Sequence, residues 1–432
     1  LPSFAETYRS SDFGWSEGMD ITYRLPAKIN AGTFRPGDEL ILDHTYRISG
    51  SHQFPNDFTL SAVQGAGLDV TDATPTSNHT FLELGHRNTL RNVTITYLNT
   101  PPPSPDAGNH PQRGVDFYPM NGIVASGKSD IRIEHCRLYG SINHQVKLTH
   151  CSSPQVVGTH IVGGFWSSYF TGDVTDAVYR NCVIEKCQGD GIKTGRAGGL
   201  GIKRVLVENC VFQDNLRDGI DTTGGWKDSV IRNSIFRRCG LDLKSIYERP
   251  SDLSEDIRNT GILIENNHFI DTGNAIAIST IDRGVAYNGR HFLDAESAQE
   301  YAPHDIELID NIFEITGTTN AKMLLVKGGH TVTYTNSRFL SGEDAKIQPY
   351  RLVNVFDTFG PGTLSEEASD ALNHGVTGTL GLAGPPISIP GDTSVPFVYG
   401  PIPEPATISL MALPALCLLR RRRRGEPDEF GP

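Results

Sequence analysis

The sequence contains a short repeat in which the side-chain alternation slips by one residue at a fixed position. In one copy Val205, Val207 and Asn209 alternate on one side of the chain, and Cys210 and Phe212 continue on that side directly afterwards. Two short β-strands joined at a bend give this pattern, because side chains within one strand can only alternate. Further copies centre on Asn92, His135, Thr159, Asn181, Asn233, Asn266, Asp310 and Asn336.

The copies are separated by about 22 to 28 residues, with longer insertions in places. A repeat of this length predicts a solenoid in which each copy forms one coil and stacks on its neighbours. We expect the polar residue at each bend to point inward, satisfy a backbone group and stack on its equivalent in the next coil. Cys136, Cys182 and Cys210 follow three of these bends and are expected to be small buried side chains.

The repeat resembles that of the pectate-lyase-like proteins. The opening segment supports the resemblance: Ile29-Asn30-Ala31 is followed by the run Pro36 to Leu42 and by Tyr46. The resemblance implies an all-β fold, a single-stranded right-handed parallel β-helix of about 9 to 11 coils. On this basis residues 1–27 form an N-terminal cap, 28–345 the β-helix, 346–400 a Gly/Pro-rich segment or linker, and 401–425 a separate tail.

The tail resembles the PEP-CTERM sorting signal of exported bacterial proteins. Its parts are the triplet Pro403-Glu404-Pro405, an apolar run from Ile408 to Leu419, and five arginines from Arg420 to Arg424. Twelve helical residues span roughly 18 Å, which is shorter than the ~30 Å hydrocarbon core of a membrane. The resemblance implies export, transient contact with the membrane and the sorting machinery, and a final place at the cell surface or outside the cell.

Composition narrows the set of partners. The formal net charge of −12 argues against nucleic acid, because phosphate binding requires a basic surface. The same charge disfavours an acidic polysaccharide unless a cation or a local basic patch offsets the repulsion. We expect a monomer with an acidic polysaccharide as its substrate.

Charged residues recur at one place in successive coils. Val146, Ile192 and Ile220 fall eleven residues after their bends and should point inward, so the residues that follow them should point outward. Adjacent parallel strands lie about 4.8 Å apart, which brings residues of neighbouring coils together. The predicted cluster contains Lys147, Asp190, Lys193, Asp218, Asp221, Asp242 and Lys244. Amines beside carboxylates suit β-elimination on a uronate, where a base removes a weakly acidic proton and a metal stabilises the resulting charge.

Three segments of this cluster are similar to the active region of family nine pectate lyases: Gly189 to Lys193, Asp218 to Asp221, and Leu241 to Lys244. That similarity implies a calcium ion held by Asp190, Asp218, Asp221 and Asp242, with Lys244 as the catalytic base and Lys193 as the second choice. The sequence departs from the family where a paired Asp-Asp is usual, because Arg217-Asp218 stands there and supplies one carboxylate in place of two.

Other residues are candidates for holding the substrate. Lys147, Arg196, Arg217 and Arg238 carry the charge needed to bind carboxylates, and Trp226 and Tyr247 offer rings that stack on sugars. Trp166 and Tyr169 are further aromatic candidates. His144 has no metal-ligand spacing and is given no role.

Three functions remain open. The leading one is a polysaccharide lyase acting on a pectate- or alginate-like polymer. A glycoside hydrolase on the same fold would use the aspartates as acid and base, but the polygalacturonase signatures (Asn-Thr-Asp, Asp-Asp and Gly-His-Gly) are absent. The third is a non-catalytic β-helix that binds glycan or builds the cell envelope.

Overall fold

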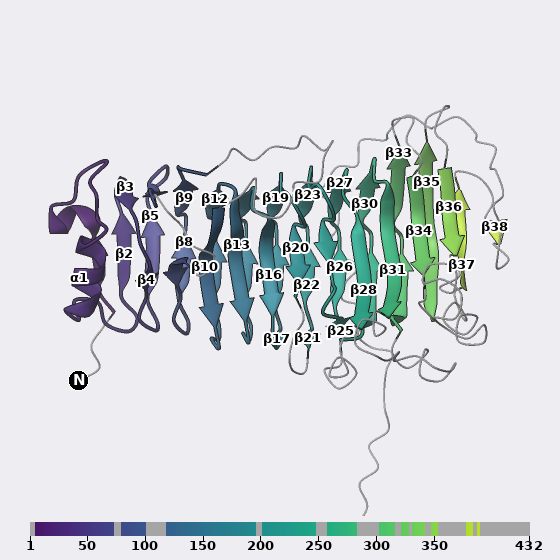
Figure 1. The fold of residues 1–432 in the computed structure, drawn as a ribbon, viewed down its shortest axis with the longest axis horizontal. Helices are drawn as coiled ribbons and strands as arrows, with labels where there is room; N and C mark the ends of the chain where they lie inside the picture. The colour runs from purple at the N-terminus through teal and green to yellow at the C-terminus, as the bar shows by residue number, and fades with distance from the viewer. Residues whose placement is uncertain are drawn as a thin grey trace, which may run out of the picture.

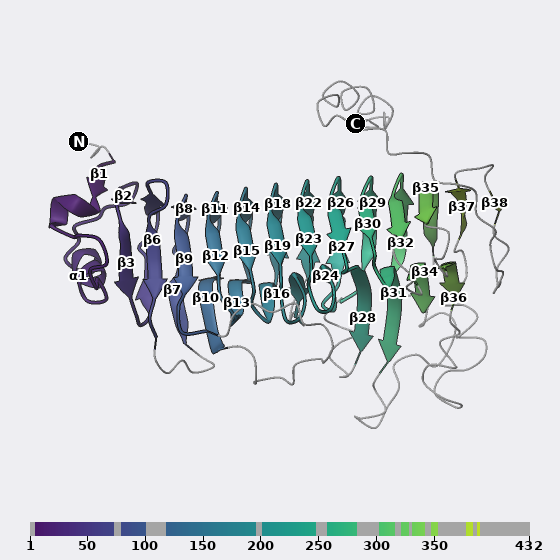
Figure 2. The same cartoon turned by 90° about the horizontal axis from the view of Figure 1, so that it is seen from above.

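In the computed structural model the chain forms an elongated right-handed parallel β-helix, as predicted. The structure describes residues 5–72, 79–100, 118–195, 201–247, 257–282, 302–315, 321–327, 331–341, 347–352, 377–382 and 387–388. Figures 1 and 2 show the coils stacked along one axis, from the purple N-terminal end to the yellow strands. Among the described strands, every strand pairing is parallel except that between β37 and β38. Apart from the short η1 and α1, the described elements are strands, so the all-β fold class is confirmed.

One face of the coils is an eleven-stranded sheet, here called the site sheet, and its strand count agrees with the expected number of coils. Its strands are β4 (His52–Gln53), β7 (Thr80–Glu83), β10 (Tyr118–Ser126), β13 (Ile142–Thr149), β16 (Trp166–Thr171), β20 (Ile192–Thr194), β24 (Ile220–Asp221), β28 (Leu241–Tyr247), β31 (Asn274–Asp282), β34 (Ala321–Lys327) and β36 (Ile347–Leu352).

The other two faces belong to one 27-stranded sheet, because the long strand Val332–Ser341 runs through the bend and pairs with strands of both faces. The first ladder contains β1 (Thr7–Arg9), β2 (Glu39–Leu42), β5 (Thr59–Ala62), β8 (Thr89–Arg91), β11 (Arg132–Glu134), β14 (Gln155–Val157), β18 (Val178–Arg180), β22 (Leu206–Glu208), β26 (Val230–Arg232), β29 (Thr260–Glu265), β32 (His304–Ile309), β35 (Val332–Ser341), β37 (Thr377–Leu382) and β38 (Ile387–Ser388).

The second ladder follows the bend. It contains β3 (Thr45–Ile48), β6 (Gly67–Val70), β9 (Thr94–Tyr97), β12 (Arg137–Tyr139), β15 (His160–Val162), β19 (Val183–Glu185), β23 (Val211–Gln213), β27 (Ile235–Arg237), β30 (His268–Ile270) and β33 (Ile312–Ile315). Three short strands, β17 (Val174–Thr175), β21 (Ile202–Lys203) and β25 (Trp226–Lys227), connect the site sheet to the first ladder in the middle coils.

The N-terminal end of the stack is covered by the turn η1 (Ser10–Phe13) and the helix α1 (Arg24–Asn30). Leu25 of this helix and the nearby Trp15 are buried, which keeps water from the first coil. β1 pairs with β2 in parallel and occupies its open edge. None of the helices in the described part of the chain has the length and apolar character needed to span a bilayer.

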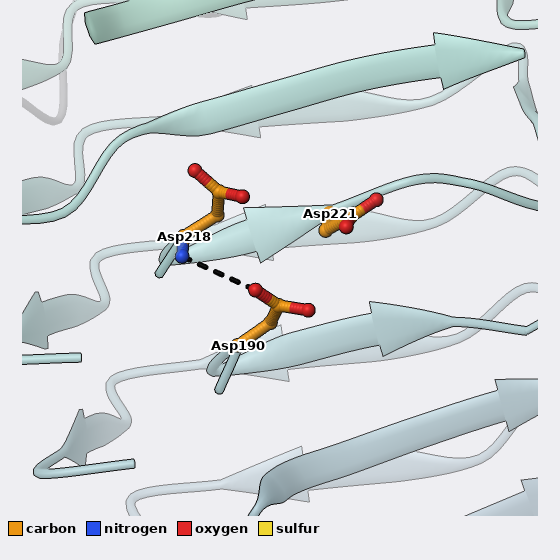
Figure 3. Close-up of side chains that lie close together, drawn as sticks. All are labelled: Asp190, Asp218 and Asp221. Atoms are coloured by element: carbon orange, nitrogen blue, oxygen red, sulfur yellow. Dashed lines mark hydrogen bonds between the residues drawn. The ribbon is translucent and has the colours of Figure 1, made fainter. Parts of the chain in front are cut away.

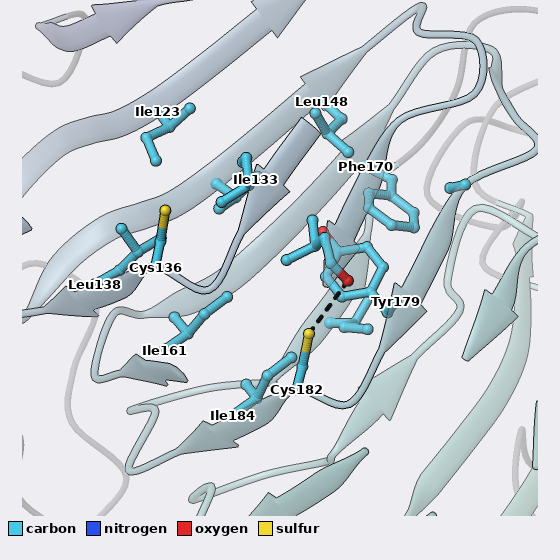
Figure 4. Close-up of a cluster of buried hydrophobic side chains, with 14 of the residues drawn as sticks. Ile123, Ile133, Cys136, Leu138, Leu148, Ile161, Phe170, Tyr179, Cys182 and Ile184 are labelled. Atoms are coloured by element: carbon cyan, nitrogen blue, oxygen red, sulfur yellow. Dashed lines mark hydrogen bonds between the residues drawn. The ribbon is translucent and has the colours of Figure 1, made fainter. Parts of the chain in front are cut away.

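Side chains of one type stack through the core from coil to coil. Phe212, Phe236, Phe269 and Phe313 lie with their rings nearly parallel and their centroids 4.9 to 5.1 Å apart. This distance matches the spacing between parallel strands, so each ring packs on its equivalent in the next coil. Cys136, Cys182 and Cys210 are buried free thiols, as predicted, and Figure 4 shows the first two among core aliphatic side chains.

The bend residues contradict one prediction. Asn181, Asn209 and Asn233 have φ angles of 53° to 56° and exposed side chains, so they point outward. Asparagine is favoured there because it tolerates left-handed backbone better than most residues. The residue that follows each of them points inward. In the copy at Thr159 it is Gly158 that has the positive φ, and Thr159 itself is buried.

The inward ladder therefore lies one residue later than expected, and its members do bond to backbone groups. Asn267 Oδ1 accepts from the Ser234 N–H at 3.0 Å, and Asn311 Oδ1 accepts from the Asn267 N–H at 3.0 Å. Asn311 Nδ2 in turn donates to the Ile264 carbonyl at 2.9 Å. Each side chain thus satisfies backbone groups that the bend leaves unpaired.

Candidate functional site

Strand register places the predicted charged residues in one outward row of the site sheet. Lys147 pairs with Tyr169, Tyr169 with Lys193, Lys193 with Asp221, and Asp221 with Asp242. These residues come from five consecutive coils that are far apart in sequence. Their convergence on one face is the geometry that the repeat predicted.

The inward neighbours fix this orientation. Ile192, Ile220 and Leu241 are each at most 1% exposed, so the residue after each of them must face outward. Val146 and Leu243 are equally buried. Burial of these side chains is favourable by about 1.5–3 kcal/mol each, which sets the register of the charged row.

Two lysines share one carboxylate at the centre of the site. Lys193 Nζ and Lys244 Nζ both bond to Asp221 Oδ2, the second at 2.7 Å. Lys244 Nζ also donates to Asp242 Oδ2 at 2.7 Å, and Lys193 Nζ donates to Thr223 Oγ1 at 2.8 Å. The hydroxyl of Thr223 donates to Asp221 Oδ1 at 2.7 Å. Sequence reasoning did not identify Thr223, although it lies two residues after Asp221 on the same side.

Asp190 and Asp218 reach the site from the turns that precede β20 and β24 (Figure 3). Asp190 is fully buried, and its Oδ1 accepts from the Asp218 N–H at 3.2 Å. Asp190 Oδ2 is buried without a hydrogen-bond partner and lies 3.6 Å from Lys193 Nζ. A buried carboxylate oxygen without a hydrogen-bond donor is costly, so this atom suits a cation.

The four aspartates of the site differ in the direction of their pKa shifts. Burial, together with the negative charge of Asp221, raises the pKa of Asp190 to about 6. Burial and the neighbouring Asp190 and Asp242 raise the pKa of Asp218 well above its usual value, and burial raises that of Asp242. Burial also acts to raise the pKa of Asp221, but Lys193 and Lys244 outweigh it, so that pKa is lowered.

A metal ion fits the acidic part of the site. One oxygen each from Asp190, Asp218 and Asp221 lies within 4.8 Å of the others, an arrangement compatible with calcium, which takes several oxygen ligands. With Asp242, Lys193 and Lys244 included, four carboxylates and two ammonium groups leave a formal charge of −2, which one divalent cation would neutralise. Asp242 lies outside the set of three oxygens and instead bonds to Lys244.

The structure modifies the role expected of Lys244. A lysine acts as a base at neutral pH when its pKa is lowered. Burial does act to lower the pKa of Lys244, but Asp221 and Asp242 outweigh it and raise that pKa above its usual value. Lys244 is therefore held protonated until its carboxylate partners are engaged elsewhere.

The predicted substrate-binding residues have different positions. Lys147 lies in the charged row, two coils before Lys193. Arg217 is exposed beside Asp218, with its guanidinium 5.6 Å from the centre of the Phe165 ring. Arg238 lies at the bend before β28 in an ion pair with Asp214 at 2.5 Å. Arg196 and the side chain of Tyr247 lie outside the described residues.

The prediction that Trp226 stacks on a sugar is wrong. Its side chain is fully buried, and its indole N–H donates to Thr194 Oγ1 at 2.7 Å. The ring packs against Phe170 inside the coil, with 6.2 Å between centroids. A large apolar ring gains more from the core than from the surface, which explains its place.

The outward aromatic residues are Trp166 and Tyr169 on β16. Their rings stack with a centroid distance of 5.1 Å and an interplanar angle of 13°. Tyr169 stands in the row position occupied by lysine in the coils on either side. The sequence offered Tyr169 only as an aromatic candidate, because it lies eleven residues after its bend at Gly158, whereas Lys147 and Lys193 lie twelve after His135 and Asn181.

Comparison with known proteins supports the fold. Residues 174–347 match the family model of the right-handed β-helix region. A polygalacturonase from Erwinia carotovora ssp. carotovora has a TM-score of 0.56 and 14% identity, over 82% of this chain and 97% of that one. DFA-IIIase from Arthrobacter chlorophenolicus A6, in complex with GF2, has a TM-score of 0.55 and 9% identity, over 86% and 94%.

More distant still is the A-module of a mannuronan C-5 epimerase from Azotobacter vinelandii, with a TM-score of 0.45 and 11% identity over 80% of this chain and 100% of that one. No curated protein sequence matches the chain. The strand pairing, the family-model match and the two structures with TM-scores above 0.5 together establish a right-handed parallel β-helix.

Proposed function

We propose that this chain is a polysaccharide lyase that cleaves a uronate-containing polymer, pectate- or alginate-like, by β-elimination. One observation carries the proposal: Lys193, Lys244 and the four aspartates meet on one outward face of the site sheet. Elimination requires a base beside a group that neutralises the substrate carboxylate, and this cluster contains both kinds of group.

We assign a role to each charged residue of the site. Lys244 is the proposed base and Lys193 the second choice, with Asp242 fixing the position of the Lys244 ammonium group. Asp190, Asp218 and Asp221 would hold a calcium ion. When bound, calcium supplies positive charge that neutralises the uronate carboxylate and stabilises the charge left by proton removal. Engagement of Asp221 by another cation removes one of the two negative charges that raise the pKa of Lys244.

A glycoside hydrolase is the second candidate, favoured by the pKa division between Asp218 and Asp221. An inverting hydrolase keeps its carboxylates about 6.5–9.5 Å apart to admit water. The nearest oxygens of these aspartates lie within 4.8 Å, which is too short for inversion and leaves the retaining geometry, in which the carboxylates stand about 5–5.5 Å apart. The lysines at the centre have no part in acid–base hydrolysis by two carboxylates. Elimination therefore ranks first.

The test is a panel of pectate, alginate and glycosaminoglycans, each with calcium and with a chelator. Elimination gives an unsaturated product that absorbs in the ultraviolet, whereas hydrolysis gives reducing ends without that absorbance. We expect unsaturated product from a uronate polymer, and its loss with chelator. Reducing ends alone would establish a hydrolase, and inertness on every polymer would favour the non-catalytic glycan-binding alternative.

Matched lysine variants test the assigned roles. Lys244→Ala should lower kcat by at least about 100-fold, the usual contribution of a positioned base. Lys203→Ala, on β21 of the large sheet, removes the same charge outside the site and should leave kcat unchanged. Unchanged activity in Lys244→Ala would remove this residue as the base and transfer the assignment to Lys193.

We also propose that the protein is exported and sorted through residues 401–425, which lie outside the described residues. The support is the ordered succession of Pro403-Glu404-Pro405, an apolar run and five arginines. Deletion of residues 403–424 should retain the protein in the cell of a host that has the sorting machinery. Equal release of both forms into the medium would contradict this proposal.

A further inference from the structure

A group of aromatic and polar side chains adjoins the charged cluster on its N-terminal side. Asn121, His144 and Trp166 pair in register on β10, β13 and β16, and Lys147 and Tyr169 form the neighbouring row. The second row continues directly into Lys193 and Asp221. The two groups therefore share one outward face. We call the group of Asn121, His144, Trp166, Lys147 and Tyr169 the aromatic wall.

The rings of the aromatic wall are packed on one another. The His144 ring lies 4.5 Å from that of Tyr169 and 5.5 Å from that of Trp166. His144 Nδ1 and Asn121 Oδ1 are 2.6 Å apart, so the imidazole donates to the amide oxygen. Burial, with Lys147 as the smaller cause, lowers the pKa of His144 to about 3. The imidazole is therefore neutral, and Lys147 carries the only positive charge of the wall.

Glycines in the next coil make room for both outward rings. A side chain at Gly195 would collide with the Tyr169 hydroxyl, and one at Gly189 would lie 3.1 Å from the Trp166 indole. The rings thus lean toward the coil that carries Asp190 and Lys193. Trp166 and Tyr169 keep partial exposure, so part of their aromatic surface is open to a ligand beside the charged site.

Lys147 supplies charge at the far end of the wall. Among the residues that the structure describes, its ammonium group is in no ion pair, in contrast to Lys193 and Lys244. It lies two coil spacings from Lys193, about 9.6 Å along the axis. A ligand that spans this distance with a carboxylate at one end and a flat apolar ring face in the middle would fit both features.

From these features we infer that the aromatic wall is a sugar-binding subsite for a second uronate of the substrate, so that the polymer crosses the coils from Lys147 toward Lys244. A pyranose ring stacks on Trp166 and Tyr169, and its neighbour's carboxylate pairs with Lys147. The inference rests on the proposed function for the identity of the ligand. It adds that substrate is held on the N-terminal side of the reacting bond, where the wall lies.

The test combines two disruptive variants, Trp166→Leu and Lys147→Gln, with one conservative replacement and one control. Trp166→Leu removes the stacking ring and should raise KM for the polymer about threefold to tenfold with little change in kcat. Trp166→Phe should recover most of that loss. Lys147→Gln should raise KM by about threefold and make KM less dependent on salt, since one ionic contact is lost. Lys203→Gln, on the large sheet, should change neither.

Electrophoresis through gels that contain polygalacturonate, alginate or neutral dextran gives a readout without turnover. The unsubstituted protein should be retarded by a polyuronate and not by dextran, and both variants should migrate faster. Lys147→Gln keeps the test valid if Trp166→Leu does not fold. Unchanged KM and unchanged retardation in both variants would overturn the subsite. Absence of unsaturated product with normal, variant-sensitive retardation would overturn the lyase and leave the subsite in place.

Discussion

Replacement of Asp190 by asparagine should stabilise the metal-free protein at neutral pH. Asp190 is fully buried, and its pKa is raised from 3.8 to about 6. A shift of one unit corresponds to about 1.4 kcal/mol, so the ionised carboxylate costs about 3 kcal/mol in the folded state. Asparagine has the same shape and keeps an oxygen that accepts from the Asp218 N–H. Asp190→Asn should therefore raise the free energy of unfolding by about 3 kcal/mol.

The pH dependence gives the sign of the effect. Between about pH 4 and pH 6 the folded protein binds the Asp190 proton more tightly than the unfolded chain does, so stability falls as the pH rises through this window. Below pH 4 the carboxyl is protonated in both states, and the variant should match the unsubstituted protein. Above pH 6 the difference should be fully developed. Urea unfolding with chelator at pH 4 and pH 7.5 measures both limits.

Calcium should offset most of this difference in stability. At a free concentration one hundred times its Kd, a ligand that binds only the folded state adds about 2.7 kcal/mol. The unsubstituted protein should gain this stability, and Asp190→Asn should gain much less because one carboxylate ligand is lost. Two results would refute the assignment of an unfavourably buried carboxylate. One is lower stability of Asp190→Asn than of the unsubstituted protein at pH 7.5 with chelator. The other is a stabilisation by Asp190→Asn at pH 4 as large as that at pH 7.5.

Three further predictions concern the coil. At φ 54° Asn209 has a left-handed conformation that alanine adopts less readily, so Asn209→Ala should cost about 1–2 kcal/mol by thermal unfolding, whereas Asn209→Gly should cost less. Asn267→Ala leaves buried backbone groups unpaired and should cost about 1–3 kcal/mol in urea unfolding. Phe236→Ala removes a ring from the core stack and should cost about 3–5 kcal/mol, while Phe236→Leu should cost less by the same measurement.

The coil could be predicted from the sequence because its physical cause is local. Alternation that slips by one residue requires a bend, and the copies are similar enough to be aligned by eye. The direction of the bend residue could not be predicted in the same way, since a slip arises whichever of two neighbouring residues takes the turn. Asn209 takes it with left-handed backbone, and Cys210 then points inward. Only backbone geometry distinguishes the two solutions.

The same alternation predicted which charged residues face outward, but it did not predict the chemical role of each one. That Lys193, Asp221 and Asp242 face outward depends on the burial of Ile192, Ile220 and Leu241, which hydrophobicity indicates. The pKa of Lys244 depends on its distance to two carboxylates, which no sequence pattern encodes. The outward position predicted for Trp226 was wrong because it too depends on local geometry. Trp226 follows Gly224-Gly225, and this turn directs its ring into the core.

The strand lengths of the site sheet explain why the cluster forms where it does. β20 and β24 have three and two residues, whereas β16 and β28, to either side, have six and seven. In a long strand only alternate residues reach the outer face, so carboxylates within it stand one row apart. A strand of two or three residues brings the preceding turn close to that face as well, and Asp190 and Asp218 enter the cluster from those turns. Short strands thus add a second row of carboxylates beside Asp221, while the turns before them keep backbone hydrogen bonds to the next coil, as from the Gly191 N–H to the Asp218 carbonyl at 2.9 Å. The unfavourable burial of Asp190 is a cost of assembling the site, and a protein selected for stability alone would have no reason to retain it.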